Sequence, residues 1–469
     1  MSIINCFSSS KGLGIDGIVE SYYVYADGKV SAGDFVEFIN GLPSQATDSA
    51  YFSPSTSLST FSPRCISATR IDTNKFLVAY GVYDTDASTG YYKGCAKIGT
   101  ISGDTITFSS EYIFKAVGNG TGIGNYISVD SLSGTSKCII TYTNQGDGKI
   151  HAVIGTISGT TVSFGATVEV QEVSDISNPT VIYVSTTKAM LIYNRGSNAY
   201  NATVAILAIS DTTITSTTIS FNPGDGGGWA YISMCKISST MFLVSGCGQR
   251  VGATRAEAKC CVITISGSSI SYGEVYPFFE GNTNGSKVCF IDTGSTITKF
   301  FIMFVDTDNN YSGKALMCTR SGSTLTFYDI YTFYDTNKGV YDNESIYALN
   351  ISTTEVVIAY TTTKRSSRTA DCINIQVATI STDNKIDFTL PLGIGVNAAA
   401  SNWLRPRLVK IGQTKFLLAY THLGGIACEY EYSSSSKNQI RKTTTSQFIG
   451  IAKTKGTGGN QVKVYVPDI

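Results

Sequence analysis

KFLVAY, at Lys75–Tyr80, is one of seven similar stretches that recur along the chain. The other six are KCIITY from Lys137, KAMLIY from Lys188, MFLVSG from Met241, KFFIMF from Lys299, EVVIAY from Glu355 and KFLLAY from Lys415. Most are short apolar runs without an internal charge, which is typical of a strand buried on both faces. Successive copies begin 51 to 62 residues apart. The copies therefore predict a repeat architecture built on buried strands.

A second motif, a turn of small polar residues between two strands, follows six of the seven copies. It reads ISGDTITF from Ile101, ISGTTVSF from Ile157, ISDTTITS from Ile209, ISGSSISY from Ile265, RSGSTLTF from Arg320 and ISTDNKIDF from Ile380. A period in the fifties, made of strands and turns, is typical of a β-propeller with one four-stranded blade per repeat. We therefore predict an all-β fold with a seven-bladed β-propeller over Ser62–Tyr432.

The seventh copy is truncated, because IACEYEY and a polar linker follow KFLLAY without an ISG turn. Another segment must then supply the outermost strand of its blade. Ala50–Ser53 is the candidate, which would close the ring from the N-terminal side, and the linker Lys437–Thr445 is the alternative. The predicted domains are 1–45 and 433–469 for the two halves of a small β-barrel-like domain, 46–61 for a linker, and 62–432 for the propeller.

Charge composition argues against binding to polyanions. The chain has 35 Lys and Arg residues against 35 Asp and Glu residues, so its formal net charge is zero. Such a chain has no overall field to attract nucleic acid or an anionic membrane. Its first ten residues lack the basic start and apolar core of a secretory signal. We expect a protein made in a cytoplasm, with no nucleic-acid partner.

Metal and disulfide chemistry are not expected. The twelve cysteines are spread over different predicted blades and include no C-x-x-C pair, so we expect free, buried thiols. Only His151 and His422 could supply imidazole. The stretches DTDASTG from Asp84 and DTDNN from Asp306 resemble the opening of a calcium loop but lack its closing glutamate. We predict no cofactor and no metal ion.

Loop lengths indicate where a ligand would bind. The first and third connections within a blade are short turns, whereas the second, such as Gly81–Lys93 and Gly246–Lys259, and those between blades are long and unlike one another. In a propeller these two kinds of connection lie on opposite faces. Variable loops on a rigid scaffold are typical of a recognition surface. We call the face that carries the second connections and the connections between blades the long-loop face.

Residues of the long-loop face suit a carbohydrate ligand. Its predicted loops combine aromatic rings, which stack on the apolar faces of sugars, with charged and amide groups. The alternative is that each aromatic ring braces its own loop against a blade. The predicted ligand-binding residues are Tyr91, Tyr92, Trp229, Arg250, Arg255, Tyr311, Arg365 and Trp403.

Catalysis is not predicted, although propellers also carry glycosidases. A glycosidase needs two carboxylates flanking the scissile bond. The ISG turns lack the Asp and Trp of the S-x-D-x-G-x-T-W box of sialidases, and no pair of carboxylates stands out. We therefore expect a binding protein and not an enzyme.

The two ends of the chain resemble a known family. GKVSAGDFVEFIN at Gly28–Asn40 and FIGIAKTKGTGGNQVKVYVP at Phe448–Pro467 are similar to a small β-domain of tailed-bacteriophage virion proteins, found in capsid-decoration proteins and in the mounting segments of tail and fibre proteins. The matching residues are Ala32, Gly33, Asp34, Val36, Gly450, Ala452, Gly459, Val462 and Val464. The resemblance implies a domain that mounts the protein on the virion, with the propeller inserted between its halves. The turn sequence ISGTTVSFG also resembles the turns of phage fibre and receptor-binding propellers.

These inferences together predict a virion structural protein of a tailed phage or a related particle. As a tail fibre or receptor-binding protein it would present the long-loop face outward and attach to a bacterial surface glycan. Its partners would be other virion proteins, from the tail, baseplate or capsid, and it would be a homo-oligomer or present in many copies. The alternative is a capsid-decoration or head-fibre protein whose propeller is a scaffold without a host ligand.

Overall fold

The computed structural model of the protein describes residues 18–26, 35–43, 56–59, 63–83, 91–102, 105–118, 121–171, 176–195, 201–224, 228–248, 257–294, 297–335, 339–340, 345–364, 369–389, 391–395, 406–410, 415–420, 426–431, 436–442, 450–452 and 461–467. All its regular elements are strands, and none of the described residues form a helix that is long and apolar enough to span a membrane. The chain forms two compact units, and the larger one comprises Pro54–Phe388 and Gly393–Glu429.

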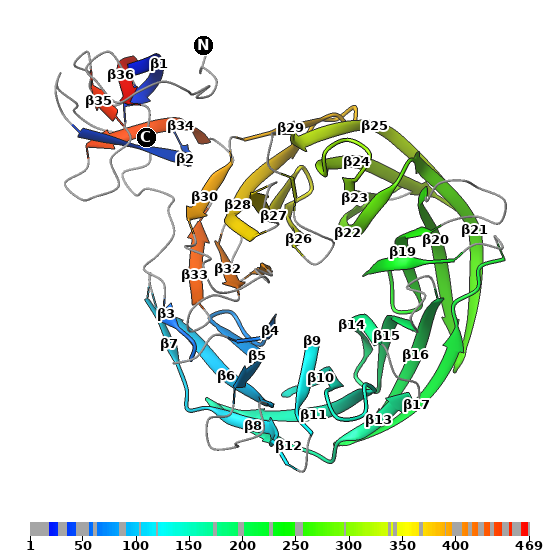
Figure 1. The fold of residues 1–469 in the computed structure, drawn as a ribbon. Helices are drawn as coiled ribbons and strands as arrows, with labels where there is room; N and C mark the ends of the chain where they lie inside the picture. Colours follow the sequence, from blue (N-terminus) through cyan, green and yellow to red (C-terminus); the bar gives the residue numbers. More distant parts are fainter. Residues whose placement is uncertain are drawn as a thin grey trace. The chain divides into compact units, whose positions relative to one another are not determined.

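The larger unit is a β-propeller with six complete blades (Figure 1). Each is an antiparallel sheet of four or five strands that are consecutive in sequence. Blade 1 contains β4 (Cys65–Arg70), β5 (Lys75–Tyr83), β6 (Tyr92–Ser102), β7 (Thr105–Phe108) and β8 (Tyr112–Lys115). Blade 2 contains β9 (Ile123–Leu132), β10 (Lys137–Asn144), β11 (Ile150–Ser158), β12 (Thr161–Phe164) and β13 (Val168–Gln171). Blade 3 contains β14 (Ile176–Ser185), β15 (Lys188–Arg195), β16 (Asn201–Ser210) and β17 (Thr213–Ser220).

The other three complete blades follow the same order. Blade 4 contains β18 (Ala230–Lys236), β19 (Met241–Gly248), β20 (Glu257–Ser266) and β21 (Ser269–Glu280). Blade 5 contains β22 (Thr283–Thr293), β23 (Thr298–Asp306), β24 (Ser312–Ser321) and β25 (Thr324–Tyr334). Blade 6 contains β26 (Ile346–Ser352), β27 (Glu355–Lys364), β28 (Thr369–Ile380), β29 (Ile386–Phe388) and β30 (Leu392–Gly395).

The prediction of a seven-bladed propeller is corrected to six complete blades and a composite closing sheet. The seventh copy supplies only three strands, β31 (Arg407–Lys410), β32 (Lys415–Tyr420) and β33 (Ile426–Glu431). A fourth strand, β3 (Thr56–Ser57), pairs with β33. The closing strand therefore comes from the N-terminal side, as predicted, but from Thr56–Ser57. Ala50–Ser53 lies outside the described residues.

The ring closes because innermost strands of successive sheets touch one another. Contacts run from β4 to β9, β14, β18, β22, β26 and β31, and from β31 back to β4 (Figure 1). The seven recurring stretches are the second strands, β5, β10, β15, β19, β23, β27 and β32. Their central residues are buried on both faces, as the apolar spelling predicts: Phe76, Leu77, Val78, Ala79 and Tyr80 are all fully buried.

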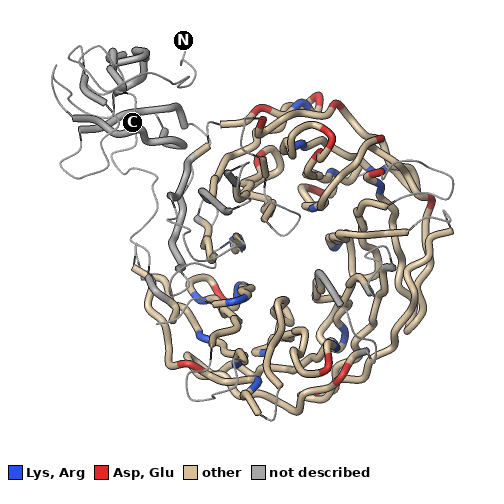
Figure 2. The backbone as a smooth tube through the Cα atoms, in the orientation of Figure 1, with Lys and Arg blue, Asp and Glu red and all other residues tan. Residues whose placement is uncertain are grey.

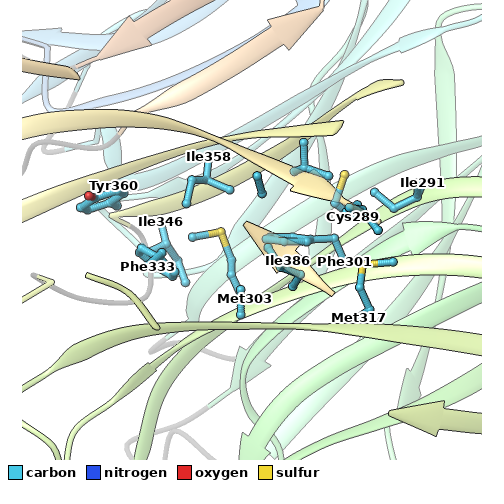
Figure 3. Close-up of a cluster of buried hydrophobic side chains, with 14 of the residues drawn as sticks. Cys289, Ile291, Phe301, Met303, Met317, Phe333, Ile346, Ile358, Tyr360 and Ile386 are labelled. Carbon is cyan, nitrogen blue, oxygen red and sulfur yellow. The ribbon is translucent and has the colours of Figure 1, made fainter. Parts of the chain in front are cut away.

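Apolar side chains fill the spaces between neighbouring blades. Between blades 5 and 6, Phe301, Met303 and Met317 pack against Ile358 and Tyr360 (Figure 3). Burying a side chain of this size contributes roughly 1.5–3 kcal/mol. Because each blade buries one face against the next, no single blade could hold its core alone.

Cysteines are part of these cores. All nine described cysteines are free and buried, including the neighbours Cys260 and Cys261 on β20. Burial raises the pKa of the Cys138 and Cys289 thiols to about 12. These thiols are therefore protonated at neutral pH. The side chains of Cys6, Cys372 and Cys428 lie outside the described residues.

We expect a reducing agent to leave the melting temperature of the protein unchanged, because the described thiols stabilise the core by packing and not by cross-links. Thermal unfolding with and without dithiothreitol measures this. A drop of several degrees on reduction would reveal a disulfide, since such a bond contributes roughly 2–4 kcal/mol.

The smaller unit contains strands from both ends of the chain. These are β1 (Ile18–Ala26), β2 (Phe35–Pro43), β34 (Ser436–Lys442), β35 (Gly450–Ala452) and β36 (Gln461–Pro467), which pair in the order β1-β34-β2-β35-β36. β36 also pairs antiparallel with β1. Because β34 pairs with β1 and β2, the alternative closing strand at Lys437–Thr445 is wrong for its strand portion.

Candidate functional site

Connections between strands of the propeller fall into two groups, short turns and long loops. Five third-to-fourth-strand turns contain only two residues, and in the four turns that the structure describes the first residue has a positive φ, which glycine tolerates best. These first residues are Gly159, Asp211, Gly267 and Gly322. By contrast, the second-to-third-strand loops 84–91 and 249–256 each contain eight residues. The side of each blade that carries the long loops is where a recognition surface can vary.

On that side, blade 1 and the first strand of blade 2 carry a cluster of aromatic and polar side chains, which we call the tyrosine patch: Arg64, Tyr83, Tyr92 and Asn125. Tyr83 and Tyr92 are opposite each other on β5 and β6, and their rings meet edge to face with centroids 5.7 Å apart. The Arg64 guanidinium carbon lies 4.8 Å from the Tyr92 ring centroid, and its Nε donates to Asn125 Oδ1. Tyr83 is 39% exposed. The patch therefore offers an accessible ring, Tyr83, next to a second ring that carries a cation.

A glycine of the next inter-blade loop fixes the backbone of the patch. A Cβ added to Gly122 would lie 2.6 Å from the carbonyl oxygen of Tyr92 and 3.1 Å from Cβ of Tyr91. Only glycine permits an approach this close. Tyr91 and Tyr92, both predicted ligand-binding residues, are thus half-buried and held in place by a neighbouring loop.

Blade 5 repeats this arrangement around Tyr311, another predicted ligand-binding residue. Tyr311 is 37% exposed and has a φ of 58°, a conformation that non-glycine residues rarely adopt. Its carbonyl accepts a hydrogen bond from the Val340 amide at 2.9 Å, and a Cβ on Gly339 would lie 2.7 Å from Cβ of Tyr311. The inter-blade connection therefore holds this exposed ring in place.

Two residues assigned to the long loops from the sequence are instead part of the core. Trp229 is 1% exposed and packs edge to face on Phe221, with ring centroids 5.1 Å apart. Lys259 lies on β20, is fully buried, and places its Nζ 4.8 Å from the Trp229 ring centroid. The prediction that Trp229 binds ligand is therefore corrected, because its ring braces blade 4 against blade 3. Strand β20 begins at Glu257, earlier than the predicted loop end.

The remaining predicted ligand-binding residues, Arg250, Arg255, Arg365 and Trp403, lie outside the described residues or side chains. Of the predicted mounting residues, Ala32, Gly33, Asp34 and Gly459 also lie outside them. Five fall on paired strands, where Val36 is opposite Gly450 and Ala452 is opposite Val464. Val462 is opposite Val24. Both motifs are thus brought together across some 400 residues of sequence, and their mounting role stays a prediction.

Of the two calcium-like stretches, the one at Asp84 lies outside the described residues, and the other uses its carboxylates within the fold. Asp308 accepts hydrogen bonds from the amide nitrogen and the side-chain Nδ2 of Asn282, at 3.0 and 2.8 Å. Asp306 is buried and accepts the Asn309 amide at 3.2 Å. Asp308 therefore holds the β23–β24 turn to the connection before blade 5, and Asp306 closes the turn itself.

A cluster that the sequence analysis did not single out lies on blade 2. Ligand atoms of Asp147, His151 and Glu169 lie within 4.8 Å of one another. Asp147 Oδ2 is 3.0 Å from His151 Nε2, and Glu169 pairs with Lys149 at 2.8 Å. His151 engages Asp147, and Lys149 outside the cluster engages Glu169, so both carboxylates already have partners. Only the spacing of Asp147 and His151 is visible in the sequence.

The sequence analysis also missed a cavity of about 500 Å³ at the centre of the ring. Residues of β4, β9, β14, β18, β22, β26 and β31 line it. Each strand contributes only a few residues, so no local motif marks the cavity. We call it the central cavity.

Comparison with solved structures confirms the fold. The BP39L lectin from Burkholderia pseudomallei superposes with a TM-score of 0.52 at 10% identity, covering 83% of this chain and 98% of the lectin. The Hadza microbial sialidase Hz136 has a TM-score of 0.42 at 10% identity, covering 88% of this chain and 93% of that one. The WD40 domain of SCAP from fission yeast has a TM-score of 0.44 at 9% identity, covering 85% and 99%. No family model and no curated protein matches the chain. The protein is a β-propeller, a fold that it shares with this lectin.

Proposed function

We propose that the protein is a carbohydrate-binding propeller that attaches a phage or phage-like particle to a bacterial surface glycan. The observation that supports this proposal is the tyrosine patch on the long-loop side, where the exposed Tyr83 ring packs on Tyr92 and the Arg64 guanidinium lies over the Tyr92 ring. Sugar rings combine apolar faces with a rim of hydroxyls, and such a patch can stack on the former and hydrogen-bond the latter.

The proposal assigns the protein no catalytic role. Asp308, a carboxylate near a long loop, is engaged in a structural contact with Asn282. Glu111 accepts from Tyr80 Oη at 2.7 Å and pairs with Lys93 at 2.9 Å. Burial disfavours its charged form, but these hydrogen bonds outweigh burial and hold the pKa of Glu111 below its usual value. A carboxylate held ionised in this way is poorly suited to act as a general acid.

The terminal unit would be the virion mount. Strands β2, β35 and β36 carry the two motifs that resemble phage mounting domains, and they pair directly. The mount would bind other virion proteins of the tail, baseplate or capsid and display many copies of the propeller. Weak binding at each single site is then sufficient for adhesion. A dissociation constant of 1 mM corresponds to a binding free energy of only about 4 kcal/mol, but multivalent display raises the overall avidity.

Bead display tests the proposal. We expect the full-length protein to bind bacterial cells poorly as a free molecule but well when many copies are fixed to one bead. Replacing loop residues 84–91 and 249–256 by Gly-Ser turns should abolish adhesion without unfolding the protein, because both segments lie between strands. The replaced segments must not extend to Lys259, since its buried side chain contacts Trp229.

Point variants localise the effect. Replacing Tyr83 and Tyr92 by alanine should reduce bead adhesion strongly, whereas Ile330→Ala should not, although Ile330 is as exposed as Tyr83. Adhesion that survives both loop replacement and the tyrosine variants would show that another surface binds the cells. If intact beads adhere to no strain of a broad bacterial panel, the capsid-decoration alternative replaces this proposal.

A further inference from the structure

Equivalent residues of the seven innermost strands line the central cavity, as the pairing of each innermost strand with its second strand shows. On each innermost strand, one residue pairs with the fifth residue of the recurring stretch, as Ser67 pairs with Ala79. The equivalent residues on β9, β14 and β18 are Ser128, Thr180 and Ser233. On β22, β26 and β31 they are Lys287, Tyr347 and Arg407. All seven line the cavity, so this level of the ring has a hydroxyl arc and an arc of long, mostly basic side chains.

Three members of the hydroxyl arc join neighbouring blades. Ser67, Ser128 and Ser233 each accept a hydrogen bond through Oγ from a backbone amide of the next innermost strand, at 3.1 to 3.2 Å. A hydroxyl that accepts one hydrogen bond keeps its own O–H as a donor. These bonds hold the oxygens in fixed positions beside the cavity, where the O–H can turn toward a ligand.

The basic arc gathers positive charge on the other side of the cavity. The Arg407 guanidinium carbon lies 5.8 Å from the Tyr347 ring centroid. Nearer the short-turn end, Arg70 and Lys410 belong to adjacent strands, β4 and β31. Burial, and then the charge of Arg70, lower the pKa of Lys410. Figure 2 shows basic positions on several innermost strands around the centre.

Asp130 is the only carboxylate among the described lining residues, against the four basic residues Arg70, Lys287, Arg407 and Lys410. It already accepts hydrogen bonds from the amides of Tyr183 and Ser131, both at 2.8 Å. Thr69 Oγ1 donates a third at 3.3 Å. Asp130 thus lies on the hydroxyl side of the ring, and one carboxylate cannot balance four basic side chains.

We propose that the central cavity binds a small carboxylate-bearing sugar, with its carboxylate on Lys287 and Arg407 and its hydroxyls on Ser128, Thr180 and Ser233. A guanidinium matches a planar carboxylate with two parallel hydrogen bonds. The opposite arc presents hydroxyls, which pair with the rim of a sugar. A cavity of about 500 Å³ falls within the range of small-molecule sites. This inference goes beyond the proposed function, because it names a ligand class for a site separate from the tyrosine patch.

The test measures binding of free sugars to the full-length protein by saturation-transfer NMR and calorimetry at constant ionic strength. Glucuronate is the probe, glucose is its neutral match, and inorganic phosphate is an anion without sugar hydroxyls. We expect glucuronate to bind with a dissociation constant near 1 mM or below, and glucose to bind at least about tenfold more weakly. Phosphate binding as tight as glucuronate would overturn the sugar assignment.

Variants place the site. Lys287→Gln and Arg407→Gln should each weaken glucuronate binding about tenfold or more, because each removes a charged hydrogen-bond donor. Thr180→Val should produce a smaller loss on the hydroxyl side. Lys137→Gln is the matched control, since Lys137 is a basic residue paired with Asp211 outside the cavity, and it should change nothing. Thermal unfolding of each variant confirms that it folds.

The free-sugar test and the bead-adhesion test can each fail without the other, so they judge the two proposals separately. If beads adhere to cells but glucuronate does not bind, or binds equally well to Lys287→Gln and Arg407→Gln, the cavity proposal is wrong and the proposed function stands. If glucuronate binds in the cavity but beads never adhere, the adhesion function is wrong and the cavity site stands. A free monosaccharide and the end of a glycan chain are distinguished by whether glucuronate competes with bead adhesion.

Discussion

Gly99→Val is expected to destabilise the propeller by about 3 kcal/mol, near the upper end of the usual cost of overpacking a core. Gly99 on β6 is opposite Phe76 on β5, and a side chain there would overlap the Phe76 ring. The ring cannot move aside, because Phe76 is fully buried and packs edge to face on Phe108 at a centroid distance of 6.0 Å. Thermal and denaturant unfolding would measure the loss.

Gly118→Val is the matched control for that substitution. Gly118 is exposed, and a Cβ built on it would meet no other atom within 4 Å. We expect its effect to stay within about 0.5 kcal/mol, the usual range of surface substitutions. Equal destabilisation by both variants would mean that loss of glycine, and not overlap with Phe76, determines the result.

The same pair of residues shows what the sequence can and cannot predict. The recurring apolar stretches and the ISG turns predict the second strands and the tight turns, because both depend on local composition and spacing. Volume matching across strands is not visible in either. Phe76 is opposite Gly99, whereas the equivalent Ala189 is opposite Leu207. Each blade fills its interior with a different combination of large and small side chains.

The site was harder to predict than the fold for a related reason. Lys259 and Trp229 read as loop residues, because a buried cation over an indole has no local pattern that separates it from an exposed one. The central cavity combines equivalent residues that are 52 to 61 positions apart, from the least regular strand of each blade. Tyr83 was missed because β5 continues three residues beyond the KFLVAY stretch. Tertiary contacts, and not the local sequence, bring these residues together.

Leu58→Ala is expected to cost about 3 kcal/mol, within the usual range for a buried leucine, and to loosen the ring at its closure. The closing strand β3 has only two residues, Thr56 and Ser57, paired with Ala427 and Ile426 of β33.

Leu58 follows directly after this strand and anchors it. It is 1% exposed and belongs to a core cluster with Phe76 and Tyr80 of blade 1 and Leu417 of the closing sheet. Its carbonyl also accepts a hydrogen bond from Lys97 Nζ at 2.6 Å. A two-residue strand can hold little by its own pairing, so this side chain carries much of the closure.

Hydrogen exchange separates loosening of the closure from general destabilisation. In Leu58→Ala, amides of β31–β33 and of β4 should exchange faster than those of blades 3 to 5, because local opening precedes global unfolding where contacts are fewest. Leu325→Ala, which removes a leucine buried to a similar degree in blade 5, is the control. It should lower stability without selective exchange at the closing sheet. If Leu58→Ala accelerates exchange equally in every blade, the ring does not depend on this residue for its closure. In that case the contacts of β31 with β4 and β26 suffice to hold the two ends of the propeller together.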